Sequence, residues 1–130
     1  MMRMRLYQIN TDRDEKGLAF MSYEFVKRRT HSEKIDRRIY DCVFDGEVNC
    51  KSLESVFALF NFRYPDGYQG RSLSLSDVVE VLDGEHVPKG LYFCDSIGFK
   101  EVMFDQQKKD AAVKENDRPI RPKKREEAER

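Results

Sequence analysis

The sequence predicts a small α+β domain, with an antiparallel sheet of four to five strands and two helices, followed by a disordered charged C-terminal tail. Short alternating runs of apolar residues predict the strands, and apolar residues at helical spacing behind a serine predict the helices. The chain has 130 residues, 9 of them Phe and 6 Tyr, too many aromatic residues for wholly disordered protein. After Phe104 no aromatic residue occurs. We therefore place the domain at residues 1–104 and the tail at 105–130.

The first third predicts one strand and one helix. Residues 3–9 alternate, with Met4 and Leu6 on one face, and Tyr7 and Ile9 add apolar groups to the other face near the end. Residues 10–16 are polar and predict a turn. Ser22 is expected to cap a helix running to about residue 29, whose last residues, 27–29, are basic. These basic residues suit the negative end of the helix; the alternative is a patch for a polyanion.

Residues 39–44 predict a second strand. Tyr40, Cys42 and Phe44 are expected on one of its faces, and Gly46 is expected to end the strand or mark a turn.

Ser52 is expected to cap the second helix. Leu53, Val56, Phe57 and Phe60 follow at the spacing of a single apolar stripe. Phe57 is central in this stripe, and we expect it to be buried.

The last third predicts β structure. Residues 73–81, 91–94 and 99–104 are the expected strands, and residues 95–98 form a tight corner. Short connections favour an antiparallel meander.

Few residues suit catalysis or metal binding, so we expect no enzyme activity and no cofactor. The three cysteines, Cys42, Cys50 and Cys94, form no C-x-x-C pair, and an odd count argues against a disulfide scaffold. The sequence contains neither G-x-x-x-x-G-K-[ST] nor G-x-G-x-x-G, the two glycine-rich phosphate-binding motifs. A scattered Cys₂His₂ zinc site and a Cys94 nucleophile assisted by His86 remain as alternatives to ordinary packing.

One cluster of polar residues differs from the rest of the chain. Its candidate members are Ser74, Ser76, Asp77, Asp95 and Gly98. We expect the two aspartates to accept backbone N–H bonds around turns, because an unpaired acid on an apolar face is costly to bury.

The alternative interpretation of this region is a polar recognition spot. Its candidate rim residues are Tyr68, Arg71 and Phe99.

The same region carries a family resemblance. The run GRSLSLSDVVEV, followed by YFCDSIGFKEV, resembles the YodL-like domain, and RLYQIN, FMSYEFV, IDRRIYDCVFDGEV and SLESVFALFN are also similar. The resemblance covers residues 3–104 and departs from the family pattern at Ser76, where glycine is frequent. It implies an accessory domain of Firmicutes chromosomes, mobile elements and large polyvalent proteins, with no catalytic residues to carry over.

We therefore expect a non-catalytic protein-interaction module whose partner is another protein. The alternative is a nucleic-acid-associated or anti-defence accessory protein that uses basic segments, although the net charge is zero. The tail is either solvated or a basic docking segment through Arg118, Arg121, Lys123, Lys124 and Arg125. No apolar run reaches the roughly 18 residues that a membrane span needs, and no signal peptide is visible, so a cytoplasmic location is expected.

Overall fold

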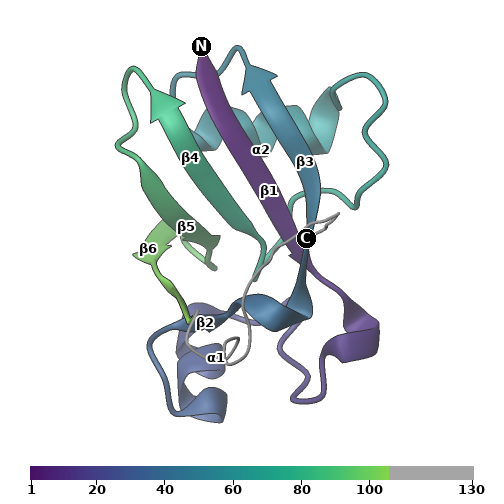
Figure 1. The fold of residues 1–130 in the computed structure, drawn as a ribbon, viewed down its shortest axis with the longest axis vertical. Coiled ribbons are helices and arrows are strands. Elements are labelled where there is room, and N and C mark those ends of the chain that lie inside the picture. The colour runs from purple at the N-terminus through teal and green to yellow at the C-terminus, as the bar shows by residue number, and fades with distance from the viewer. Residues whose placement is uncertain (106–130) are drawn as a thin grey trace, which may run out of the picture.

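The computed structural model describes residues 1–105 and contains a five-stranded antiparallel sheet in the order β3-β1-β4-β5-β6 (Figure 1). The strands are β1 (Met2–Ile9), β3 (Tyr40–Val48), β4 (Val78–Gly84), β5 (Gly90–Cys94) and β6 (Phe99–Val102). A second, two-stranded sheet pairs β2 (Ile35–Asp36) in parallel with β7 (Phe104–Asp105). The predicted α+β class with its antiparallel sheet is confirmed. The predicted disordered tail lies beyond the described residues, except for Asp105.

The two predicted helices are also confirmed. They are α1 (Tyr23–Thr30) and α2 (Leu53–Phe62), and each begins directly after its predicted serine cap. The Ser22 hydroxyl accepts the Phe25 N–H at 3.3 Å, and Ser52 forms a capping box with Ser55. Two short 3₁₀ helices, η1 (Thr11–Arg13) and η2 (Arg37–Ile39), complete the described secondary structure.

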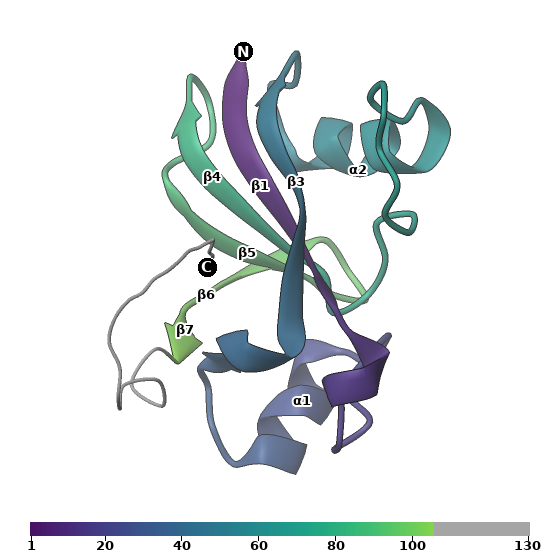
Figure 2. The same ribbon diagram turned by 45° about the vertical axis from the view of Figure 1, so that its right-hand side comes forward.

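The first hydrophobic core lies between α2 and one face of the sheet (Figure 2). Val56 and Phe60 of α2 are fully buried against Met4 and Leu6 of β1. The expectation that Phe57 is buried is wrong, because its side chain is 38% exposed.

Phe57 is exposed because of the way α2 is rotated about its own axis relative to the sheet. Leu53 and Leu59 pack against the core on either side of Val56 and Phe60. At about 100° per residue, the centre of this set lies close to Val56, and Phe57 projects about a quarter turn away from it. The apolar stripe is real, but Phe57 is at its solvent edge.

The second core lies around α1, β2, η2 and β7, at the lower end of the sheet (Figure 2). Tyr7 and Ile9, at the end of β1, are buried there with Val78 and Phe93. The Tyr7 ring meets the Phe104 ring edge-on at 5.3 Å. The face of β1 that carries Tyr7 and Ile9 is therefore buried at the end of the strand, in agreement with the apolar groups that the sequence places there.

The predicted face of the second strand is wrong because β3 contains a bulge. Leu6 pairs with Phe44 whereas Tyr7 pairs with Cys42, which leaves Val43 as an extra residue. Phe44 consequently packs against the first core, whereas Tyr40 is buried in the second and Cys42 is exposed.

The strand also continues through Gly46 to Val48 rather than ending there. A Cβ at Gly46 would lie 3.2 Å from the Phe44 ring, so glycine leaves room for that ring inside the strand.

Two other predicted strands are shorter than expected. The chain turns before β4: the Asp77 N–H donates to the Ser74 carbonyl at 3.1 Å, and Ser76 has a φ of 77°. Residues 73–77 are therefore not strand. The predicted strand at 99–104 divides at the exposed Met103, after which Phe104 pairs with Ile35 of β2.

Candidate functional site

A buried hydrogen-bond cluster lies where the polar cluster is predicted. Gln8 is at its centre: its Nε2 donates to the Arg71 carbonyl at 2.8 Å and to the Asp77 Oδ2 at 3.0 Å, and its Oε1 accepts the Arg71 N–H at 3.0 Å. The Ser74 N–H donates to the same Asp77 oxygen at 2.9 Å. We call Gln8, Arg71, Ser74 and Asp77 the Gln8 cluster. It holds residues 71–77 against the end of β1.

Asp77 has an unusual environment for a carboxylate. Its side chain is 1% exposed, and burial raises its pKa from 3.8 to about 7, because desolvation disfavours the charged form more than the donors from Ser74 and Gln8 favour it. Oδ2 accepts both of these bonds, whereas Oδ1 has no partner among residues 1–105. A partner molecule cannot reach this carboxylate, so its contribution is to the architecture.

Two candidate rim residues are bonded into the same region. The Tyr68 hydroxyl donates to the Arg71 carbonyl at 2.6 Å, and the Arg71 guanidinium donates to the Ile9 carbonyl at 2.9 Å. The guanidinium also lies 5.2 Å from the centre of the Phe20 ring. Tyr68 and Arg71 therefore connect the 68–71 loop to β1 and to the segment before α1.

Ser76 links the same segments through its backbone and its hydroxyl. Its hydroxyl accepts the Phe20 N–H at 2.9 Å, and its carbonyl accepts the Tyr40 hydroxyl at 2.6 Å. The Ser76 N–H donates to the Cys94 carbonyl at 3.0 Å, and the Cys94 N–H donates to the Asp77 carbonyl at 2.8 Å. The segment ahead of β4 is thereby bonded to the end of β5, next to Asp95.

Asp95 joins the β5–β6 turn to α1. Its Oδ1 accepts the N–H of Ser96 at 2.8 Å and the N–H of Tyr23, the first residue of α1, at 3.1 Å. A carboxylate at this position also favours the positive end of the helix dipole. The turn closes with the Asp95 N–H donating to the Gly98 carbonyl at 2.9 Å, and Gly98 has a φ of 72°, which glycine adopts without strain.

The third rim residue, Phe99, lies in a different place from Tyr68 and Arg71. It lines a cavity of about 280 Å³ between α2 and the β5–β6 turn. We call this cavity the turn pocket; it is lined by Glu54, Phe57, Cys94, Asp95, Ser96, Gly98 and Phe99. The structure thus divides the predicted rim: Phe99 is grouped with Asp95 and Gly98, whereas Arg71 belongs to the Gln8 cluster and Tyr68 donates a hydrogen bond to Arg71.

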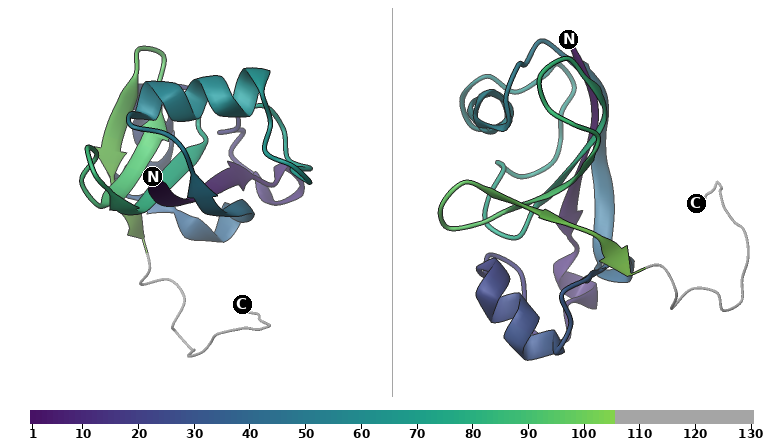
Figure 3. Two further views of the ribbon diagram at one scale, coloured as in Figure 1. Left: turned by 90° about the horizontal axis from the view of Figure 1, so that it is seen from above. Right: turned by 90° about the vertical axis from the view of Figure 1, so that its left-hand side faces the viewer.

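The segments next to the turn pocket carry exposed apolar side chains. Ile97, at the tip of the turn, is 93% exposed, and Phe57 and Met21 are each 38% exposed. Met21 precedes the α1 residue that Asp95 binds, and Figure 3 shows α1, the β5–β6 turn and α2 along one side of the molecule. We call Met21, Phe57, Ile97 and Phe99 the apolar surface.

Sequence reasoning missed Met21, Phe57 and Ile97 as surface residues. The sequence did contain one signal for Ile97. It lies in a four-residue corner, and a side chain in so tight a turn is usually exposed.

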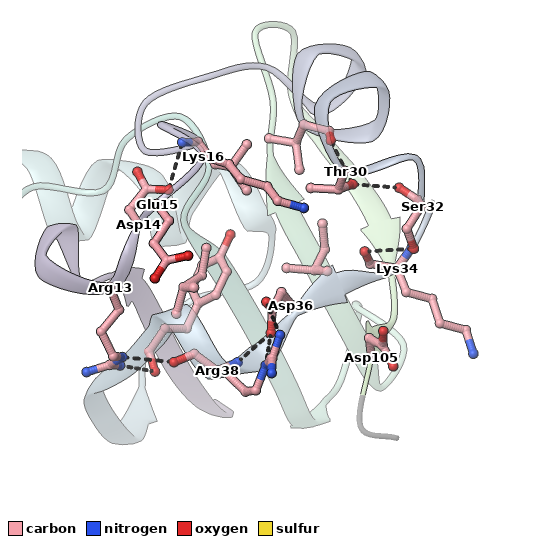
Figure 4. Close-up of a pocket in the computed structure, with 15 residues that line it drawn as sticks. Arg13, Asp14, Glu15, Lys16, Thr30, Ser32, Lys34, Asp36, Arg38 and Asp105 are labelled. Carbon is pink, nitrogen blue, oxygen red and sulfur yellow. Dashed lines mark hydrogen bonds and ion pairs between the residues drawn. The ribbon is translucent and has the colours of Figure 1, made fainter. Parts of the chain in front are cut away.

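A second cavity, of about 340 Å³, lies beside α1 and η2 (Figure 4). Four basic and four acidic residues line it, and several of these charges are bonded within the fold. Arg13 binds Asp41 at 2.7 Å, Arg38 binds Asp36 at 3.0 Å, and Asp14 accepts the N–H groups of residues 18 and 19. This balanced lining favours neither an anion nor a cation.

Within residues 1–105, no group of three His, Cys, Asp or Glu side chains could hold a metal ion. The alternative of a Cys94 nucleophile is also disfavoured, because burial raises the pKa of the Cys94 thiol to about 12. His86 precedes β5 whereas Cys94 ends it, so the two residues are at opposite ends of the strand. In this part of the chain, neither helix has the length and apolar character to cross a membrane.

Two of the basic residues at the end of α1 make contacts within the fold. Arg28 lies 3.8 Å from Glu24, one helical turn earlier, and Arg29 donates to the Lys16 carbonyl at 3.1 Å. Both contacts are compatible with the predicted role of these residues at the helix end.

Comparison with known proteins gives one match. The model of the YodL-like domain family matches residues 3–104, which include both helices and the whole five-stranded sheet apart from Met2. Searches of curated proteins and of solved structures returned no match. The matched range agrees with the resemblance seen in the two C-terminal motifs, and the chain belongs to the YodL-like domain family.

Proposed function

We propose that this chain is a non-catalytic protein-interaction module whose protein partner binds at the apolar surface. The observation that carries the proposal is the fully exposed Ile97 beside Phe57 and the turn pocket. Isolated exposed apolar residues are common, but here three segments of the chain contribute to one side.

The support beneath this surface is suited to binding. Hydrogen bonds from Asp95 hold the turn to α1, and Cys94 is bonded to residues 76 and 77. A surface held in one conformation loses less conformational entropy when a partner binds. Burying the exposed Ile97 side chain would contribute roughly 1.5–3 kcal/mol, and the partly exposed Phe57 and Met21 would each add less.

The Gln8 cluster supports this interpretation by its burial. It bonds β1 to residues 71–77 and encloses Asp77 away from solvent, so neither a substrate nor a partner can reach this carboxylate. We propose a mobile element or its Firmicutes host as the setting on the family resemblance alone, and a cytoplasmic location on the sequence features given above.

The test compares apolar positions on and off the proposed surface. Ile97→Asp and Phe57→Asp are made in the full chain, with Phe62→Asp as the matched control, since Phe62 is 77% exposed on the same helix and does not line the turn pocket. The variants are used as bait in host lysate, captured proteins are quantified by mass spectrometry, and folding is checked by circular dichroism.

We expect a partner that the wild type and Phe62→Asp retain and that Ile97→Asp and Phe57→Asp lose. The same set of captured proteins with all four baits would refute the proposal.

A further inference from the structure

The charged residues that line the turn pocket are all acidic. Glu54 and Asp95 are the only charged side chains among the seven lining residues, and Glu54 is exposed at the start of α2. Both backbone N–H groups that reach the Asp95 carboxylate bind Oδ1, which leaves Oδ2 available to a cation. Between these acids the lining is formed by Phe57, Phe99 and Cys94. The pocket therefore suits an apolar side chain with basic neighbours.

The same chain contains such a segment. Residues 118–125 read RPIRPKKR, in which Ile120 is the only large apolar residue and Arg118 and Arg121 lie on either side of it. After Asp105 the chain has one other large aliphatic residue, Val113. It follows two alanines and precedes Lys-Glu-Asn, so the residues around it carry no excess of positive charge. Charge and side-chain type together select Ile120.

The chain is long enough for this segment to return to the pocket. Residues 98–105 lead from the turn to the end of β7, a path of at most about 23 Å for a fully extended chain. Residues 106–119 can span up to about 46 Å by the same rule. The segment can therefore reach the turn pocket of its own molecule.

We propose that residues 118–125 dock in the turn pocket of the same chain, with Ile120 between Phe57 and Phe99 and the flanking arginines against Glu54 and Asp95. The regulatory consequence rests on the proposed function: the segment covers part of the apolar surface and competes with the partner for it. A tethered ligand of this kind acts at a high effective concentration, so modest intrinsic affinity is sufficient.

The experiment uses ¹H–¹⁵N NMR spectra of the full chain, with no partner present. We compare the wild type with Ile120→Asp and with the matched control Val113→Asp, which makes the same kind of change elsewhere in the tail. Ile120→Asp is expected to shift the amide signals of residue 54, residue 57 and residues 95–99, and Val113→Asp is expected to leave them in place. Raising NaCl from about 0.1 M to about 1 M is expected to shift the wild-type signals toward those of Ile120→Asp, because salt screens the ion pairs.

A tenfold dilution separates docking within one chain from docking between two copies. Wild-type signals that stay in place on dilution support the proposal, whereas signals that move toward those of Ile120→Asp would overturn it in favour of a second copy. Spectra of wild type and Ile120→Asp that agree at the turn pocket would also overturn it.

The outcomes separate this inference from the proposed function. If Ile120→Asp leaves the turn-pocket signals unchanged while Ile97→Asp still loses a partner, the docking proposal is refuted and the interaction function is supported. If the signals shift but Ile97→Asp and Phe57→Asp keep every captured protein, the docking stands and the interaction function fails.

Discussion

Replacing Asp77 with Asn should change how the stability of the domain depends on pH. Burial raises the pKa of Asp77 from 3.8 to about 7, so in the folded state the carboxyl keeps its proton at pH values where the unfolded chain has lost it. Its contribution is therefore most favourable below about pH 4, falls as pH rises to about 7, and is constant above that. At 1.36 kcal/mol per pKa unit, the fall is about 4 kcal/mol.

The geometry lets Asn keep both native hydrogen bonds. Oδ2 of Asp77 accepts from Ser74 and Gln8, and the amide oxygen of Asn can occupy the same place. The amide NH₂ then takes the place of Oδ1, where no partner is available among the described residues, at a pH-independent cost of roughly 1–3 kcal/mol. We expect Asp77→Asn to be less stable than wild type at pH 4.5 and more stable at pH 8.

The assay is urea unfolding of both proteins, monitored by circular dichroism, at several pH values between 4.5 and 8. About 3 kcal/mol of the fall lies between pH 4.5 and 8, so the difference in midpoint between the two proteins should change by about 1.5 M at a slope of about 2 kcal/mol per M. Asp66→Asn, in the exposed loop after α2, controls for the loss of one negative charge. A stability difference that stays the same at every pH would refute this account of Asp77.

Four further substitutions test the packing and the turns. Phe60→Ala should lower the free energy of unfolding by about 3–5 kcal/mol, whereas Phe57→Ala should lower it by under about 1.5 kcal/mol; equal losses in chemical denaturation would contradict the orientation of α2. Gly70→Ala should cost about 1–3 kcal/mol in the same measurement, because the added Cβ would overlap the Tyr68 hydroxyl; an unchanged midpoint would show that the ring moves freely. Asp95→Ala removes an acceptor from the start of α1 and should cost about 1–2 kcal/mol, visible as a lower melting temperature; no loss would mean that Ser22 alone caps the helix.

The elements that local patterns specify could be predicted from the sequence. The caps at Ser22 and Ser52 depend on residues within one helical turn. The strand at 3–9 depends on alternation, and the strand at 91–94 depends on a short apolar run between turn residues. The meander of β4, β5 and β6 follows from short connections.

The features that depend on distant residues could not be predicted. The bulge at Val43 is set by pairing with β1, and it puts Phe44 and Tyr40 in different cores although the alternation predicts one shared face. Alternation alone places Asp77 in a strand. The turn at residues 74–77 is instead stabilised by Gln8, which lies far from it in the sequence.

One signal for the candidate site was present and not used. Gln8 has the same parity as Met4 and Leu6, so a polar side chain stands on the apolar face of the first strand. A buried amide needs partners of its own, and this requirement points to a loop folding over the end of β1.

The position of β1 in the sheet has a consequence for folding. This strand is the first strand in the sequence and an inner strand of the sheet, with β3 on one side and β4 on the other. Tyr7 pairs with Val78, so during synthesis one edge of β1 stays unpaired until roughly 70 more residues have been made. Until then its apolar residues and unpaired backbone groups stay exposed to other strands. Nascent chains should therefore be most prone to aggregation before β4 emerges from the ribosome, and a chaperone acting on this protein would bind its first ten residues.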